Sequence, residues 1–94
     1  MNYYLVTFDL HLNNEQLNEC YLKIEDYLKT FTKYVKPTNN VYLVCSDTVS
    51  SVEIRDTIKR ISENNGYYLV LGLNGAYASY NLDDVNEQLV EFFK

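Results

Sequence analysis

The sequence lacks several features that would identify a class of protein at once. It has no tryptophan, one histidine, two cysteines and one proline among 94 residues. No run of about 20 apolar residues occurs, so no membrane-spanning segment is expected. No basic segment with a cleavage site opens the chain, which predicts no signal peptide and a cytoplasmic location.

Motifs of common catalytic and metal sites are also missing. The sequence contains no phosphate-binding glycine loop, catalytic triad or zinc-ligand spacing. Cys20 and Cys45 have neither metal-ligand spacing nor a disulfide framework, and both are expected to be buried, reduced thiols. The basic-glycine-aromatic strand motif of RNA-recognition domains is absent from "NNVYLVCS". We therefore expect the paired tyrosines at the starts of strands to pack in the core or in an interface rather than to stack against the bases of RNA.

What the chain does contain is apolar surface and unevenly placed charge. Hydrophobic residues make up 47%, with ten tyrosines and four phenylalanines, which predicts one globular domain over 1–94. Counterion release drives the binding of basic proteins to nucleic acid, and a chain with a net charge of −5 gains little from it. Seven of the eight lysines and arginines lie between Lys23 and Arg60, which allows one basic and one acidic face. Glu25 and Lys29 have helical spacing and are expected to pair.

Hydrophobic periodicity predicts the order of the elements. The segment "YYLVTFD" is apolar on both faces, as in a central strand. Asn13 or Asn14 is expected to cap the first helix, Ser50 the second, and Gly66 to end the second in a left-handed conformation. The predicted strands and helices cover 3–9, 13–31, 34–36, 41–45, 50–62, 67–75 and 81–93. Pro37 confines the short strand over 34–36 to an edge or a turn.

This order predicts an α+β fold. The arrangement is a ferredoxin-like two-layer sandwich, βαββαβ, with an extra C-terminal helix. The two long helices are expected to cover one face of the sheet. Tyr3 and Leu5 would then lie on an apolar second face, and a second subunit is its simplest cover. We therefore expect a twofold homodimer through the open sheet face or its edge.

Asp9 raises the main functional question, because a strong strand ends on a carboxylate with His11 two residues further on. One carboxylate is a poor Mg²⁺ site, but two Asp9 residues across a twofold axis would supply the missing charge. The alternative is that Asp9 only ends the strand and binds turn amides. His11 is a candidate proton acceptor, or simply a histidine in a surface loop.

Ser46 and Asp47 are accessory candidates. They end the strand over 41–45 and are expected beside Asp9, where Asp47 would be a second metal ligand. The alternative is that Asp47 belongs to the turn and caps the following helix.

Three segments carry a resemblance to a known family. "VTFDL" resembles the end of the first strand of the small CRISPR-associated Cas-two nucleases, which stops on an aspartate. "VYLVCSDTVSSVEIRDTIKRI" and "YYLVLGLNGAYASY" resemble the related stand-alone SinR-like group. The resemblance implies a ferredoxin-like homodimer in which Asp9 approaches its counterpart. The two carboxylates would hold a divalent metal, Mg²⁺, that activates water to cut RNA or double-stranded DNA.

One region departs from the family. Its CRISPR members carry an arginine- and aromatic-rich stretch after the first helix, where this chain has "TKYVKPTNN" without arginine. Two functions therefore remain open at this point. One is a metal-dependent endonuclease; the other is a non-catalytic dimeric module that binds a protein partner, such as an antitoxin, a defence regulator or a phage counter-defence protein.

Overall fold

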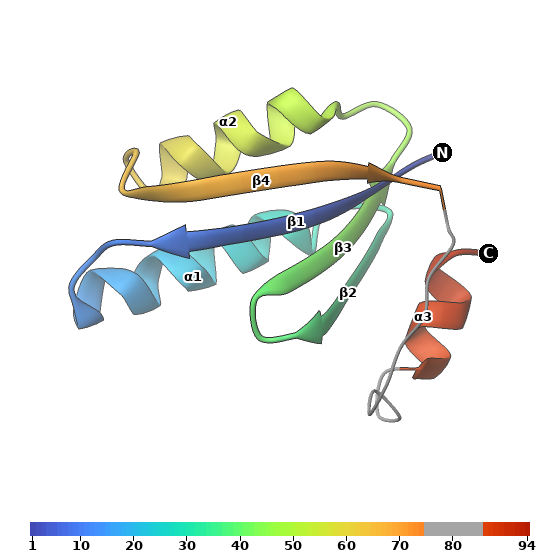
Figure 1. Ribbon diagram of the computed structural model, residues 1–94, viewed down its shortest axis with the longest axis horizontal. Helices are drawn as coiled ribbons and strands as arrows, with labels where there is room; N and C mark the ends of the chain where they lie inside the picture. Colours follow the sequence, from blue (N-terminus) through green and yellow to red (C-terminus); the bar gives the residue numbers. More distant parts are fainter. Residues whose placement is uncertain (75–85) are drawn as a thin grey trace.

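The computed structural model describes residues 1–74 and 86–94. Over this part of the chain, four strands form one antiparallel sheet and three helices pack against it (Figure 1). The elements are β1 (Asn2–Leu10), α1 (Asn14–Leu28), β2 (Lys33–Thr38), β3 (Val41–Ser46), α2 (Ser51–Ile61), β4 (Gly66–Leu73) and α3 (Asn86–Phe92). The predicted α+β class is confirmed.

The strands lie in the order β2-β3-β1-β4, and each neighbouring pair is antiparallel. β1 is therefore an interior strand, as its two apolar faces predicted. β2 lies at an edge, and its pairing with β3 shifts register between Val35 and Thr38, the stretch that holds Pro37. The edge position follows because proline has no N–H to donate to a second neighbour.

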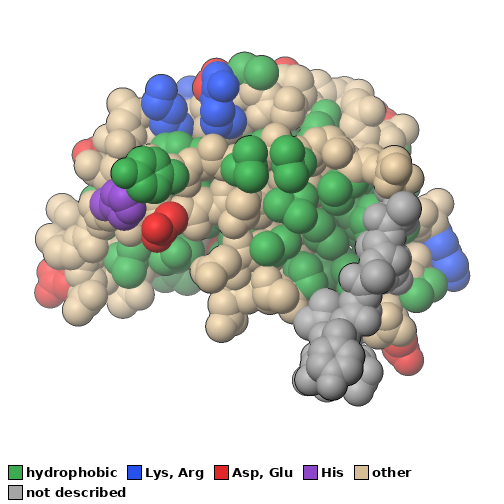
Figure 2. Space-filling view, viewed as in Figure 1, with side chains coloured by type: hydrophobic (Ala, Val, Ile, Leu, Met, Phe, Trp, Pro, Cys, Tyr) green, Lys and Arg blue, Asp and Glu red, His purple; other side chains and the backbone are tan. Residues whose placement is uncertain are grey.

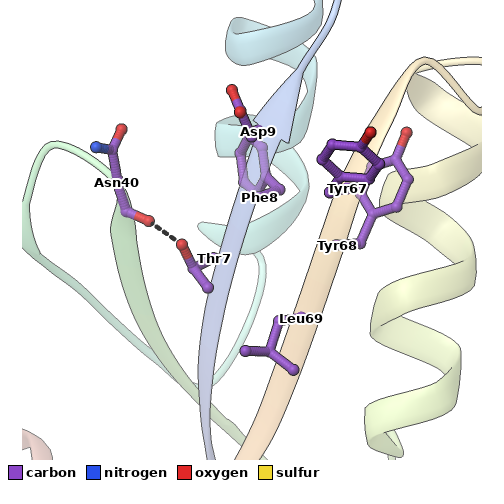
Figure 3. A pocket seen from close by; sticks show the side chains of 7 residues that line it. All are labelled: Thr7, Phe8, Asp9, Asn40, Tyr67, Tyr68 and Leu69. Atoms are coloured by element: carbon purple, nitrogen blue, oxygen red, sulfur yellow. Dashed lines mark hydrogen bonds between the residues drawn. The ribbon is translucent and has the colours of Figure 1, made fainter.

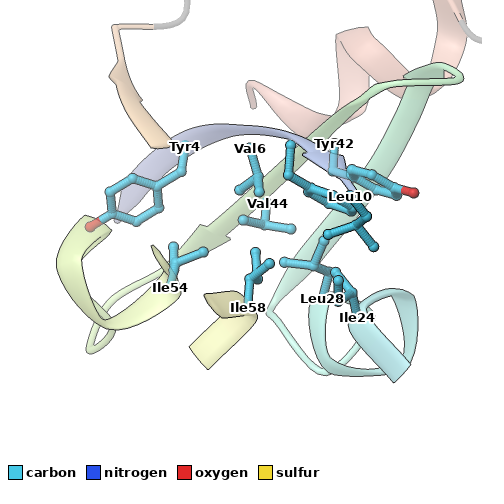
Figure 4. Packing of buried hydrophobic residues seen from close by; sticks show 10 residues of the cluster. Tyr4, Val6, Leu10, Ile24, Leu28, Tyr42, Val44, Ile54 and Ile58 are labelled. Carbon is cyan, nitrogen blue, oxygen red and sulfur yellow. The ribbon is translucent and has the colours of Figure 1, made fainter. Parts of the chain in front are cut away.

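The main core lies between the sheet and the helices α1 and α2. Alternate residues of β1 point into it, and their partners come from both helices and from β3 (Figure 4). The buried members are Tyr4, Val6, Phe8, Leu10, Ile24, Leu28, Tyr42, Val44, Ile54 and Ile58. The predicted helical stripes therefore bury the expected face of each long helix.

α3 covers part of the other face of the sheet. Leu89 and Phe92 are buried there in a second cluster with residues of β2 and β3. The ring of Tyr3 meets the ring of Phe92 edge-on, with 5.3 Å between centroids. Lys33 Nζ donates to the carbonyl oxygens of Glu91 and Phe92, at 3.0 and 3.2 Å, and so satisfies the helix C-terminus. The chain itself thus covers part of the face for which a second subunit was expected.

Side-chain caps fix where the two long helices begin. Asn13 Oδ1 accepts a hydrogen bond from the backbone N–H of Gln16 at 3.0 Å. Ser50 Oγ accepts from the backbone N–H of Glu53 at 3.2 Å. Both predicted caps are confirmed, with Asn13 rather than its neighbour in the first case.

The prediction for Gly66 was wrong. The left-handed residues after α2 are Glu63 and Asn64, with φ of 54° and 64°. Gly66 instead begins β4 and packs against β1, where an added Cβ would lie 2.5 Å from the carbonyl oxygen of Asp9. The absence of a side chain lets the two strands approach at the end of β1.

Other predictions are confirmed only in part. Both cysteines are free, but only Cys45 is buried, and Cys20 is half-buried. The last residue of the predicted strand over 67–75 and the start of the predicted helix over 81–93 lie outside the described residues. Within 1–74 and 86–94, no helix has the length and apolar character needed to cross a membrane.

The core makes a stability prediction. Ile24 is completely buried between α1 and the sheet, so Ile24→Ala removes packing and leaves a cavity. We expect a loss of about 3 kcal/mol in the free energy of unfolding, measured by urea denaturation. Leu22→Ala on the same helix is the matched control, because Leu22 is 63% exposed and its loss should cost less than about 0.5 kcal/mol. Equal effects of the two substitutions would contradict this packing.

Candidate functional site

Asp9 stands on the face of the sheet that points away from α1 and α2. Its neighbours Phe8 and Leu10 are buried on the opposite face, so the alternation of β1 turns the carboxylate outward. Asp9 pairs with Tyr67 of β4 across the ladder, and its side chain is 77% exposed. The end of an interior strand therefore presents a solvated carboxylate.

His11 lies beside this carboxylate and beside Tyr67. Its Nε2 is 3.7 Å from Asp9 Oδ2, and its ring meets the ring of Tyr67 edge-on with 4.7 Å between centroids. The backbone N–H of His11 donates to the carbonyl oxygen of Asn65 at 2.7 Å, which ties the residue to the turn before β4. The structure thus brings Asp9 and His11 together and adds Tyr67, which the sequence alone did not link to them.

These residues border a shallow, open hollow of about 440 Å³, which we call the Asp9 hollow. Side chains from the facing parts of β1 and β4 line it (Figure 3). Its lining residues are Thr7, Phe8, Asp9, Asn40, Tyr67, Tyr68 and Leu69. Thr7 Oγ1 donates to the carbonyl oxygen of Asn40 at 2.6 Å, which holds the β2–β3 turn against this end of the sheet.

The hollow opens onto an apolar surface. Tyr67, Leu69 and Leu71 project from β4 on the same face as Asp9 and are 70%, 50% and 46% exposed. We call these three residues and Asp9 the open face. Figure 2 looks onto it and shows a band of hydrophobic side chains with the histidine at one end. An exposed apolar patch beside a hydrophilic site commonly marks an interaction surface.

Ser46 and Asp47 do not lie beside Asp9. β3 runs antiparallel to β1 and pairs Ser46 with Asn2, so both residues sit at the opposite end of β1. Asp9 is seven steps along β1 from Asn2, a distance on the order of 23 Å. The proposed accessory role is thus not supported by position, because the end of β3 lies next to the start of β1.

Both residues have local contacts there instead. Ser46 is buried, and its Oγ accepts hydrogen bonds from the backbone N–H groups of Thr48 and Val49 at 3.1 and 3.0 Å. Asp47 Oδ1 is 3.4 Å from the amino group of Met1. Ser46 therefore shapes the turn before α2, and Ser50 rather than Asp47 caps that helix.

Asp9 is the one acidic side chain in the described lining of the hollow, so one chain supplies a single carboxylate there. The described residues of one chain contain no group of three histidine, cysteine or acidic side chains able to hold a metal. Mg²⁺ prefers oxygen ligands and commonly keeps several waters beside one or two carboxylates. A single exposed Asp9 carboxylate is at the lower end of that range, and two Asp9 carboxylates from two chains would be at its upper end.

A second polar cluster lies away from this site. Glu25 of α1 accepts hydrogen bonds from Lys36 Nζ and from the hydroxyl of Tyr42, both at 2.8 Å. Glu25 therefore bonds to Lys36 of β2 rather than to Lys29, the partner predicted from helical spacing. Helical spacing could not predict this pairing, because Lys36 and Tyr42 come close to Glu25 only when the β2–β3 hairpin packs against α1.

The cluster changes the acidity of its members. The hydrogen bond from Lys36 lowers the pKa of Glu25, and it outweighs partial burial of the carboxyl group. Burial of the phenol raises the pKa of Tyr42, and the neighbouring Glu25 carboxylate raises it further. Glu25 and Lys36 thus neutralise each other, and the cluster joins α1 to the hairpin.

Comparisons with family models, with curated proteins and with solved structures found no match to this chain. Its function is therefore proposed from the residues and their geometry.

The Glu25 cluster predicts a pH-dependent contribution to stability. Because the pKa of Glu25 is lowered in the folded chain, its contribution is present above the ordinary value of 4.5 and is lost as pH falls through the lowered value. Glu25→Gln should cost roughly 1 kcal/mol at neutral pH and much less in acid. Urea denaturation of both proteins at pH 7 and pH 3 measures this.

Glu19→Gln is the matched control, since Glu19 is an exposed carboxylate on the same helix. It should change stability little at either pH. A cost of Glu25→Gln that does not vary with pH would contradict the charged pair.

Proposed function

We propose that the fold is ferredoxin-like and that the chain is a homodimeric, Cas-two-like, metal-dependent endonuclease. Two features support the fold: the elements follow the order βαββαβ before α3, and the strands lie in the antiparallel order β4-β1-β3-β2 when read from the other edge. The segments that resemble Cas-two and SinR-like proteins fall on β1 and on β3 with α2, and the described part of the third falls mainly on β4.

The observation that carries the functional proposal is the exposed Asp9 carboxylate at the end of an interior strand. A residue that served only to end the strand would be expected to accept hydrogen bonds from turn amides. The exposure of Asp9 and its position at the open face suit a ligand shared with a second chain.

The homodimer is proposed to form through the open face. Leu69 and Leu71 are the apolar side chains that a second copy would cover, and Asp9 would lie near the twofold axis, where it would meet its counterpart. This leaves the outer edge of β4 accessible. The apolar contact would offset the repulsion between the two Asp9 carboxylates, which a shared cation would remove.

The proposed mechanism assigns separate roles to Asp9 and His11. Asp9 from each subunit would hold the divalent ion, which when bound lowers the pKa of a water and stabilises charge on the phosphate. His11 Nε2 lies 3.7 Å from Asp9 Oδ2, so a water held by an ion on Asp9 would be within reach of the imidazole. His11 would accept the proton of that water as it attacks phosphorus.

A second candidate function is a dimeric module that binds a protein partner. It is favoured by the net charge of −5 and by the described lining of the Asp9 hollow, which includes no lysine or arginine. An antitoxin, a defence regulator or a phage counter-defence protein would act in this way, without hydrolysis.

The proposed dimer predicts a mass of twice the chain mass of 11.1 kDa by light scattering. Leu71→Asp should shift the protein toward monomer, because it places a charge in the proposed contact. Leu22→Asp, on exposed Leu22 of α1, is the control and should remain dimeric. A strictly monomeric wild type at working concentration would contradict the dimer.

The nuclease proposal predicts metal-dependent cleavage of labelled RNA or double-stranded DNA. Cleavage should require Mg²⁺ or Mn²⁺, stop in chelator, and be abolished by Asp9→Asn. His11→Ala should slow it about 100-fold. Gel analysis of timed reactions measures each rate.

Asp9→Asn also carries its own folding control. Because Asp9 is exposed, the substitution should change the free energy of unfolding by less than about 0.5 kcal/mol. A wild type that cuts neither nucleic acid with any metal would refute the nuclease and leave the protein-binding module.

A further inference from the structure

The two edges of the sheet differ in how well they are protected from pairing with a further strand. Proteins commonly protect such edges with proline, with lysine and with breaks in register. β2 has all three, because it contains Pro37, Lys33 and Lys36 and shifts register against β3. β4 forms the opposite edge (Figure 1), and its eight residues, GYYLVLGL, are uncharged, lack proline and pair with β1 without a break. The edge of β4 is therefore open to a further strand.

The pairing with β1 shows which backbone groups of β4 point away from the sheet. The N–H of His11 donates to the carbonyl oxygen of Asn65, and these two residues continue the register of the β1–β4 pairing. Bonded and non-bonded pairs alternate in an antiparallel ladder, so the odd-numbered residues of β4 bond to β1. The N–H and C=O groups of the even-numbered residues therefore point to the outer edge, those of Tyr68, Val70 and Gly72 among them.

A shallow hollow of about 220 Å³ lies along this edge, and we call it the edge hollow. Its lining comes from the start of α2 and from both faces of β4, which places it at the rim of the sheet rather than on the open face. The lining residues are Ser51, Val52, Arg55, Tyr68, Leu69 and Val70. A homodimer through the open face leaves this rim accessible.

The edge hollow combines apolar side chains with one positive charge. Val52 is 53% exposed there. Arg55 is half exposed, and its Nε and Nη2 donate to Asp56 Oδ1 at 3.1 and 2.9 Å. A guanidinium has five N–H donors, so this pair leaves others for a second acceptor. The described lining includes no acidic side chain, so Arg55 favours a carboxylate brought by a ligand.

We propose that the outer edge of β4 binds an extended segment of a partner protein, which adds a strand to the sheet and places an acidic side chain against Arg55. Backbone hydrogen bonds to the even-numbered residues of β4 would supply affinity, and the edge hollow would select the side chains. Alternate side chains of the added strand point toward α2, where Val52 and Val70 suit apolar groups. The site uses neither Asp9 nor a metal, so it does not depend on hydrolysis.

Charge distinguishes a partner segment from the β4 strand of a second copy. β4 contains no acidic residue, so a second β4 paired along this edge would bring no carboxylate to Arg55. A segment with an acidic residue among apolar ones supplies both the backbone groups and the missing charge. A different protein is therefore the better match to this edge.

The test is fluorescence anisotropy with a labelled synthetic peptide roughly nine residues long, enough to pair with the whole of β4. The peptide alternates valine and threonine, and glutamate replaces the central valine. Wild type should show saturable binding below about 1 mM. Gly72→Pro removes an outward N–H and should weaken binding about tenfold or more. Gly72→Ala is the matched control and should bind like wild type, because it keeps the N–H and its Cβ would meet no heavy atom within 4 Å.

The contact with Arg55 is tested by changing the charge on each side. Arg55→Gln should weaken binding of the glutamate peptide about threefold, and it should not change binding of the same peptide with glutamine in place of glutamate. Arg60→Gln is the matched control, because Arg60 is exposed on the same helix and does not line the edge hollow. Equal binding of the two peptides to wild type would contradict the acidic contact.

Two N-methylated peptides test the backbone contact without changing the protein. One carries methyl groups on alternate backbone nitrogens, and the other carries them on the remaining ones. Only one set of N–H groups can face β4, so one peptide should lose binding and the other should bind like its parent. Equal binding of both, or no saturable binding of the parent peptide, would overturn the edge site.

Light scattering separates this inference from the proposed dimer. Gly72→Pro should leave the mass of the protein unchanged, whereas Leu71→Asp should shift a dimer through the open face toward monomer. A dimer that Gly72→Pro converts to monomer would show that β4 pairs with a second copy, and it would overturn both the partner segment and the open-face dimer. Peptide binding by a wild type that cuts no nucleic acid would support the edge site and refute only the nuclease.

Discussion

The structure depends on the burial of β1 along both of its edges and on its inner face. β1 pairs with β3 on one side and with β4 on the other, and it sends Val6 and Phe8 into the main core. The helices α1 and α2 have a surface to pack on only once these three strands are aligned. Gly66 is part of the same constraint, because its missing side chain lets β4 approach the backbone of Asp9. The end of β1 is therefore held firmly although the Asp9 side chain is solvated.

The outer face of the sheet is covered at one end and exposed at the other. At one end α3 buries Leu89 and Phe92 against β2 and β3, and Lys33 fixes the end of that helix. At the other end Tyr67 and Leu69 remain exposed next to Asp9. The polar and apolar groups that suit a functional site therefore coincide with the part of the sheet that α3 leaves uncovered. The Glu25 cluster, by comparison, has a structural role, because the Lys36 amino group and the Tyr42 hydroxyl both donate hydrogen bonds to the Glu25 carboxylate.

Local patterns predicted much of this fold. The alternation in β1, the helical stripes of α1 and α2 and the caps Asn13 and Ser50 involve residues close in sequence, so their geometry follows from backbone periodicity. Contacts between segments far apart in the sequence were harder to predict from local patterns. Glu25 pairs with Lys36 rather than with Lys29, and Gly66 allows β4 to approach β1 closely rather than forming a left-handed turn. In each case a residue far along the chain decided the outcome.

The same distinction applies to the candidate site. Local sequence patterns were enough to predict that Asp9 ends a strong strand two residues before His11, and that the chain forms an α+β fold with apolar surface on both faces of its sheet. Which groups meet at the site depends on how distant segments pair. The tertiary structure placed Tyr67 beside Asp9 and His11, and it put Ser46 and Asp47 at the far end of β1. The physical reason is strand direction: antiparallel pairing sets the end of one strand against the start of its neighbour, and no pattern within a single segment encodes that register.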